Sequence, residues 1–228
     1  MGYRQMTMHI RRKYDRKVNY KRIYRLMKIV GLKSVCRRKR YSYLKSTPEI
    51  TAENLLNRDF KAEHSNKKWL TDVTEFKFGN SGKKAYLSAI LDIGDNNIVS
   101  FVIGRSNNNA LVFETFDIAV AANPGAKPIF HSDRGYQYTS KAFKVKLDSV
   151  GMIHSMSRVG RCIDNGPMES FWGMLKSEMY YLRKFNDYES LKKAIEEYIH
   201  YYNNKRYQKR LNCMTPLEYK SYLYGVSA

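Results

Sequence analysis

The sequence predicts an α/β fold in which a mixed five-stranded sheet is flanked by helices and preceded by a small helical segment. From residue 68 onward, β-branched and aromatic runs alternate with amphipathic stretches in the order strand, strand, strand, helix, strand, helix, strand, helix, helix. The first 48 residues differ, since they hold 16 of the 41 Lys and Arg residues and Asp15 as their only acid. A basic helical module therefore precedes a nearly balanced α/β unit.

The excess of basic residues indicates a polyanionic partner. The 228 residues carry a formal net charge of +20, and such a charge favours binding to phosphates. The three cysteines are scattered, which favours neither a disulfide framework nor a zinc ribbon and fits a reducing cytosol. No apolar run approaches the length of a membrane span, and no secretory leader opens the sequence. We therefore expect a cytoplasmic protein with no membrane partner.

Two short helices are predicted in the basic module. The first spans residues 5–17, and the second is capped by Asn19 and ends at Gly31. One face of the second helix carries the apolar residues Ile23, Leu26, Met27 and Val30. The opposite side carries the basic residues Lys21, Arg22, Arg25 and Lys28. This pattern suggests a helix-turn-helix that contacts DNA, although a solvated helix face would show the same pattern.

A second basic run follows these helices and would track a nucleic-acid backbone. It consists of Arg37, Arg38, Lys39 and Arg40. We expect residues 1–47 to form a helix-turn-helix-like DNA-binding segment, residues 48–66 a linker arm with a short amphipathic helix near 52–58, and residues 67–224 the α/β core.

The core is predicted to open with a three-stranded meander. Its strands are expected at 69–78, 84–93 and 98–103, with a turn at 80–82. The elements that follow are a helix at 109–122, a buried strand at 128–132, a helix at 139–150, a fifth strand at 153–157 and, further on, a helix at 187–202.

Another helix is predicted to begin at Pro167, after the cap Asn165-Gly166. Its apolar stripe, which would fasten the helix to the sheet, consists of Met168, Phe171, Trp172, Leu175 and Met179. A second line along the helix holds Glu169, Gly173 and Lys176, so this edge could face a metal and a phosphate backbone. Taken alone, Glu169 is better explained by the preference of acids for the positive end of the helix dipole.

Two further acids lie in or at the end of predicted strands. Asp72 interrupts the first strand, and Asp133 follows the fourth. If the first strand is central and the fourth lies beside it, both carboxylates would converge with Glu169. Three such carboxylates repel one another unless divalent cations neutralise them, and Mg²⁺ prefers hard oxygen ligands. Spacing alone is weak support, because the 21 acids of the chain form many triples by chance.

Other polar residues near these elements receive less specific interpretations. We interpret Glu75, Asp92 and Asp95 as turn or surface acids, and His131 as a packed histidine rather than a partner of Asp133.

A loop with two arginines leads to the helix that carries Glu169. Arg158 and Arg161 flank Gly160, and we favour DNA contact over plain solvation for both arginines.

The residues around the acids resemble the integrase core of transposases with an Asp-Asp-Glu triad and of retroviral integrases. The resemblance is closer to the second-reading-frame product of the insertion-sequence-three family of transposases. The matching words span residues 69 to 219 and are Leu70-Thr-Asp-Val-Thr-Glu75, Phe130-His-Ser-Asp-Arg-Gly-Tyr-Gln-Tyr138, Ser155-Met-Ser-Arg158, Asp164-Asn-Gly-Pro-Met-Glu-Ser-Phe171, Tyr202-Asn-Asn-Lys-Arg206 and Thr215-Pro216. The segment near 2–32 resembles the helix-turn-helix that precedes this core in the family.

The resemblance implies an RNase H-like sheet with Asp72, Asp133 and Glu169 as ligands of two Mg²⁺ ions, which Mn²⁺ could replace. Lys176 falls where this superfamily places a basic residue that contacts the terminal nucleotides. Family members nick donor DNA at an element end, and the freed 3′-hydroxyl attacks another phosphodiester. Water or that hydroxyl is the nucleophile, so no protein nucleophile is implied.

The resemblance also implies partners. They are DNA, as element ends and as target; the product of the upstream reading frame, as a fusion or a separate partner; and further copies of the same chain on DNA. A location in the bacterial cytoplasm, associated with the nucleoid, follows. Two other functions remain open: a catalytically silent DNA-binding regulator, and an RNase H-fold nuclease such as a junction resolvase. The basic first 48 residues argue against the resolvase.

Overall fold

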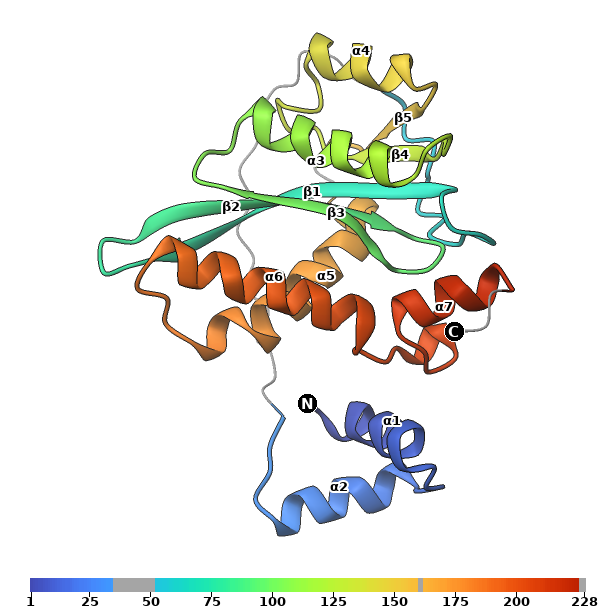
Figure 1. The fold of residues 1–228 in the computed structure, drawn as a ribbon, viewed down its shortest axis with the longest axis vertical. Helices are drawn as coiled ribbons and strands as arrows, with labels where there is room; N and C mark the ends of the chain where they lie inside the picture. Colours follow the sequence, from blue (N-terminus) through green and yellow to red (C-terminus); the bar gives the residue numbers. More distant parts are fainter. Residues whose placement is uncertain (35–51, 160–161, 226–228) are drawn as a thin grey trace.

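The computed structural model describes residues 1–34, 52–159 and 162–225 (Figure 1). The predicted basic run at 37–40 and Arg161 lie outside the described residues. Among the helices of the described ranges, none is long and apolar enough to cross a membrane.

The core is built on a five-stranded mixed sheet whose strand order is β3-β2-β1-β4-β5. Its strands are β1 (Lys68–Phe78), β2 (Lys83–Asp92), β3 (Ile98–Gly104), β4 (Ile129–Ser132) and β5 (Ile153–Met156). The first three strands pair antiparallel, while β4 pairs parallel with both β1 and β5. The first strand is therefore central and the fourth lies beside it, which is the condition for Asp72 and Asp133 to converge.

Helices cover both faces of the sheet. Figure 1 shows α3 (Asn109–Ala122) and α4 (Lys141–Ser149) on one side, with α5 (Gly166–Glu178) and α6 (Tyr188–Asn204) on the other. Successive side chains of β1 point to opposite faces, so Trp69 joins the hydrophobic cluster under α3 and α4, whereas Leu70 joins the cluster under α5 and α6. The predicted α/β fold with helices on both sides of a mixed sheet is confirmed.

Two elements of the core differ from the prediction. The helix α4 begins later than expected, because the side chain of Ser140 caps it by accepting a hydrogen bond from the backbone of Phe143. The helix α7 (Pro216–Leu223) was not predicted. It begins with a capping box in which Thr215 and Glu218 bond to each other's backbone amides.

The predicted helix near 52–58 is wrong. This arm has no helix, with a turn at 56–58, and its backbone also bonds to the edge strand β5. The amide of Leu56 donates to the hydroxyl of Ser155 at 3.2 Å, and the carbonyl of Glu53 accepts from the amide of Met156 at 3.2 Å. These long-range partners outweigh the weak helical pattern of such a short segment.

The N-terminal module contains two helices, α1 (Tyr3–Tyr14) and α2 (Tyr20–Ile29). Asn19 caps α2 as predicted, since its side chain accepts a hydrogen bond from the amide of Lys21. The apolar face of α2 is only partly covered, since Ile23 is buried and Met27 is half-buried, whereas Leu26 is 42% exposed and Val30 is 64% exposed. In the described part of the chain, α1 is the helix that packs against α2, so the side of α2 next to α1 is the side that is buried.

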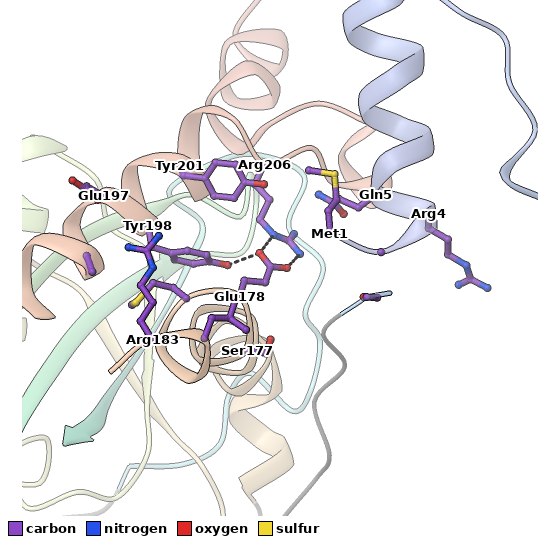
Figure 2. A pocket seen from close by; sticks show the side chains of 15 residues that line it. Met1, Arg4, Gln5, Ser177, Glu178, Arg183, Glu197, Tyr198, Tyr201 and Arg206 are labelled. Carbon is purple, nitrogen blue, oxygen red and sulfur yellow. Dashed lines mark hydrogen bonds and ion pairs between the residues drawn. The ribbon is translucent and has the colours of Figure 1, made fainter. Parts of the chain in front are cut away.

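The N-terminal module lies against the C-terminal part of the core. In α1, Gln5 donates to the carbonyl of Tyr207 at 2.9 Å, and Arg12 pairs with Glu218 at 2.8 Å. Beside these contacts is a cleft of about 590 Å³ between the module and the helices α5 and α6. Figure 2 shows an ion pair in this cleft, in which Arg206 and Glu178 approach to 2.7 Å. We call this cleft the inter-module cleft.

Candidate active site

The site lies where the adjacent parallel strands β1 and β4 leave their pairing. Leu70 of β1 pairs with His131 of β4, and Asp72 and Asp133 each follow two residues later. Because side chains alternate along a strand, both carboxylates lie at equivalent positions along the two chains and point to the same side of the sheet. They line one cavity of about 220 Å³, together with Asn107, Arg134 to Tyr138 and Val73. The structure thus brings these two predicted residues together.

Each oxygen of the Asp72 carboxylate accepts one hydrogen bond. The backbone amide of Val73 donates to Oδ1 at 2.8 Å, and the indole Nε1 of Trp172 donates to Oδ2 at 2.9 Å. Burial, together with the negative charges of Asp133 and Glu169, raises the pKa of Asp72 to about 7 against the opposing effect of those two donors. Burial and the two neighbouring acids therefore both disfavour the ionised form of Asp72.

Asp133 occupies the loop directly after β4. Its Oδ1 accepts a hydrogen bond from the amide of Gly135 at 2.8 Å, which closes a tight turn around the carboxylate. Burial raises the pKa of Asp133 above its ordinary value. Two neighbouring carboxylates with raised pKa values are a frequent signature of a functional site, although structural ion pairs also perturb pKa values.

Glu169 lies in the first turn of α5 and is exposed. Its charge is among those that raise the pKa of Asp72, so it belongs to the same electrostatic environment. Within the described ranges, however, no three His, Cys, Asp or Glu side chains lie close enough together to hold a metal ion. The structure therefore brings Asp72 and Asp133 to one cavity, whereas Glu169 is not among the residues that line it.

Two residues of the α5 segment have contacts that the sequence interpretation missed. Trp172 was assigned to packing alone, yet its N–H reaches Asp72. Asn165 was assigned as a helix cap, but it makes no capping bond with its side chain and instead donates to the carbonyl of Thr71 at 3.0 Å. A signal for Trp172 was available, because a buried indole N–H usually requires an acceptor.

Asp164, just before α5, has structural contacts that the sequence motif did not indicate. Its carboxylate is fully buried and accepts hydrogen bonds from Asn54, Arg58 and Arg158. The hydrogen bonds from Arg158 are the largest cause that holds the pKa of Asp164 well below its usual range. The predicted DNA-contact residue Arg158 is thus joined to Asp164 at 2.9 Å, so that the linker arm, the loop after β5 and the start of α5 meet at one carboxylate.

The other acids and His131 have clear structural roles. His131 is buried between the hydroxyl groups of Ser155 and Ser157, at 2.9 and 3.1 Å, which confirms the packed histidine. Asp92 and Asp95 accept hydrogen bonds from amides in the turn after β2, which confirms a turn role. A surface position for them is wrong, since they are 1% and 0% exposed.

The predicted DNA-contact residues of α2 are all exposed. Lys21, Arg22, Arg25 and Lys28 form what we call the α2 basic face. Lys176, on α5, is partly buried, and its ammonium lies 5.2 Å from the centre of the Phe76 ring. Lys176 and Glu169 are on the same helix, so α5 carries both a basic and an acidic group.

The chain is similar to integrase core domains both in sequence and in structure. Residues 62–162 and 169–222 each match a model of an integrase core domain, and residues 1–40 match a model of an HTH-like domain. In structure, the chain is similar to the HTLV-2 integrase catalytic core domain solved in complex with magnesium, with a TM-score of 0.55 and 20% identity over 69% of this chain and 97% of that one.

A second structural neighbour and two relatives extend the comparison. The simian T-cell lymphotropic virus intasome chain gives a TM-score of 0.60 at 17% identity, covering 96% of this chain and 70% of that one. A transposase-like protein of Haemophilus influenzae is 43% identical over 90% of this chain and 94% of its own length. The protein named as transposase InsK of the insertion sequence element IS150 in Escherichia coli K12 is 40% identical over 98% of this chain and 78% of its own length.

The mixed sheet, the carboxylates at its edge and the matched models define a protein with an integrase-type catalytic core behind an HTH-like domain. This class comprises enzymes that transfer polynucleotide strands. With relatives of this identity and coverage, the chain belongs to the insertion-sequence-three family of transposases.

Proposed function

We propose that this protein is a DNA transposase that nicks donor DNA at an element end and transfers the freed 3′-hydroxyl to a target phosphodiester. Its catalytic residues would be Asp72, Asp133 and Glu169. The observation that carries the proposal is the convergence of Asp72 and Asp133 in one cavity, each two residues beyond the paired ends of adjacent parallel strands. Membership of a transposase family supports the same reaction.

The residues of this cavity fit a divalent cation. Asp72 and Asp133 are oxygen donors, and burial and mutual repulsion raise the pKa of Asp72 to about 7, which a nearby positive charge would reverse. Mg²⁺ is the natural ion for carboxylate and phosphate oxygens, and Mn²⁺ has similar ligand preferences. When bound, two such ions would stabilise the attacking and leaving oxygens of an in-line displacement at phosphorus.

The chain's own residues then position the reactants. Asp72 and Asp133 would hold the ions against the cavity wall, while Glu169 would complete the ligand set from the rim as DNA enters. Lys176 would contact a phosphate or base next to the scissile bond, because it follows Glu169 along α5. Arg158 would contact the same DNA with the part of its guanidinium that does not bond to Asp164.

We further propose that residues 1–47 form a DNA-binding segment, residues 48–66 a linker arm and residues 67–224 the catalytic unit. The α2 basic face, together with the net charge of +20, supports a phosphate-bearing partner for the first segment. The proposed partners are element ends, target DNA, the upstream-frame product and further copies of this chain, in the bacterial cytoplasm and on the nucleoid.

The test is a nicking assay on element-end DNA with Mg²⁺. Glu169→Gln keeps the size of the side chain but removes its charge, and we expect nicking to fall at least a hundredfold while DNA binding is retained. Glu75→Gln is the matched control, because Glu75 lies on β1 away from the cavity and pairs with Lys84 at 2.9 Å. Equal nicking by the wild type and Glu169→Gln would refute the catalytic assignment.

One observation favours a second candidate, a DNA-binding regulator without catalytic activity. Glu169 is exposed and does not join a metal-binding group of three side chains among the described residues. A regulator would bind DNA with a steep dependence on salt but stay inactive with both Mg²⁺ and Mn²⁺. Nicking of element-end DNA by the wild type would exclude this candidate, and preferential cleavage of branched DNA would instead indicate a resolvase.

A further inference from the structure

We propose that Trp172 is a positioning residue for Asp72, in addition to its role in packing. The inference rests on the proposed function, because it assigns Asp72 to the catalytic cavity. The indole N–H of Trp172 would fix the orientation of the Asp72 carboxylate and would tie the helix that carries Glu169 to the same strand.

The first support is the pattern of hydrogen bonds around Asp72. Val73 N–H and Trp172 Nε1–H occupy one oxygen each, at 2.8 and 2.9 Å. An ionised carboxylate has about four lone-pair sites, so each oxygen keeps a further site for another ligand. With one rigid donor on each oxygen, the plane of the carboxylate is set before any ligand binds. Hydrogen bonds from neutral N–H groups to an ionised carboxylate are among the stronger ones in proteins.

The second support is the rigidity of the indole. Trp172 is 7% exposed, and its ring packs 5.1 Å from the ring of Phe171. Phe171 packs in turn against Tyr202 at 4.9 Å. Because the indole is buried and packs against Phe171, its N–H cannot swing away from Asp72 without disturbing the core.

The third support is the position of Trp172 along α5. Asn165 directly precedes α5, and Glu169 and Trp172, at i and i+3 within the helix, follow it as a row and are neighbours on the helix surface. The residues at both ends of this row donate to neighbouring residues of β1, Asn165 to the carbonyl of Thr71 and Trp172 to Asp72. Glu169 lies between these two attachments. The two hydrogen bonds therefore set how Glu169 is presented to Asp72.

The experiment compares two indole N–H groups on the same background. Trp172→Phe keeps an aromatic ring but removes the donor to Asp72. Trp69→Phe is the matched control, because Trp69 is also buried and donates to a buried aspartate, Asp92, at 3.2 Å, but from the opposite face of β1. These are the two tryptophans of the chain. Both changes remove an indole-to-carboxylate bond, and only one touches the proposed site.

We expect Trp172→Phe to raise the Mg²⁺ concentration for half-maximal nicking by about tenfold, as is typical when a residue that orients a metal ligand is removed. Trp69→Phe should leave this concentration unchanged even if it lowers the melting temperature. An unchanged Mg²⁺ requirement in a folded Trp172→Phe variant would overturn the proposal.

A second measurement does not depend on activity or on the folding of a Trp172 variant. The ¹⁵N-labelled wild-type protein should show two indole N–H signals, and Trp69→Phe identifies the signal of Trp172. We expect this signal to exchange slowly with solvent, to shift in Asp72→Asn and to shift again on titration of the wild type with Mg²⁺. Fast exchange, or no response to either change, would overturn the proposal. A responsive signal in a protein that fails to nick DNA would sink the proposed function and leave the positioning contact supported.

Discussion

Replacing Asp164 by asparagine would test how the structure holds the start of α5. The carboxylate accepts three hydrogen bonds from Arg158, through its backbone amide, Nε and Nη2, and one each from Arg58 and Asn54. Asparagine has nearly the same shape but carries no charge, and its NH₂ group would face the donors of the arginines. The change therefore removes several charge-assisted hydrogen bonds without leaving a cavity.

The exposure of the arginines determines how much stability Asp164→Asn should lose. Hydrogen bonds to charged groups contribute about 1.5–3 kcal/mol, whereas exposed ion pairs contribute about 0–1 kcal/mol. The Asp164 side chain is 0% exposed, but those of Arg158 and Arg58 are 46% and 40% exposed, so water can solvate both guanidinium groups after the substitution. We therefore expect Asp164→Asn to lower the free energy of unfolding by about 2–3 kcal/mol.

The arginine variants provide the controls. Arg158→Ala should cost about 1 kcal/mol, because Arg58 and Asn54 still neutralise and bond the carboxylate. Removing both arginines leaves a buried carboxylate without a cation, which typically costs about 3–5 kcal/mol. The double variant should therefore lose more stability than the two single variants together.

The contribution of Asp164 to stability should depend on pH in a defined direction. The folded-state pKa of Asp164 is lowered, so its contribution to stability is fully present above the ordinary aspartate pKa of about 4 and is lost as the pH falls below it. Denaturant unfolding of the wild type and Asp164→Asn should differ by a constant amount from about pH 5 to 8, and the difference should shrink below about pH 4. A difference under about 0.5 kcal/mol at pH 7, or one that grows in acid, would refute the role of Asp164.

Two further predictions concern the N-terminal module and the inter-module cleft. Arg206→Ala should lower the free energy of unfolding by about 2–3 kcal/mol, because it breaks the pair with Glu178 and the Arg206 side chain is only 11% exposed. In the same denaturant titration, Arg12→Ala should cost under about 1 kcal/mol, because both side chains of its pair are 36% exposed. Alanine at all four residues of the α2 basic face should weaken DNA binding and reduce the slope of log affinity against log salt by about 0.9 for each phosphate that is no longer neutralised. The control replaces two exposed lysines of α4, Lys141 and Lys144, by alanine and should leave this slope unchanged. An Arg206 cost no larger than that of Arg12, or an unaltered salt slope, would contradict the respective prediction.

Much of the core could be predicted from the sequence because the signals are local. The alternation along β1 and the 3.6-residue period of α3 and α6 identified these elements, since each pattern reports which side chains of one segment face a core. The pairing of Asp72 with Asp133 also followed once β1 was assumed to be central. That assumption needed a topology argument, and the structure confirmed it.

The sequence by itself determined the order of the core elements, the strand-end position of Asp133 and the surplus of charge at the N-terminus. Only the tertiary structure decided what the polar side chains contact. Trp172 donates to a residue 100 positions away, and Arg58 pairs with one 106 positions away, so no periodic pattern records either contact. The non-helical arm at 52–58 and the burial of Asp92 have the same origin, because their hydrogen-bond partners come together only when the sheet and helices pack. A segment's own pattern shows which face is apolar, whereas the partner of a buried polar group is decided by the fold around it.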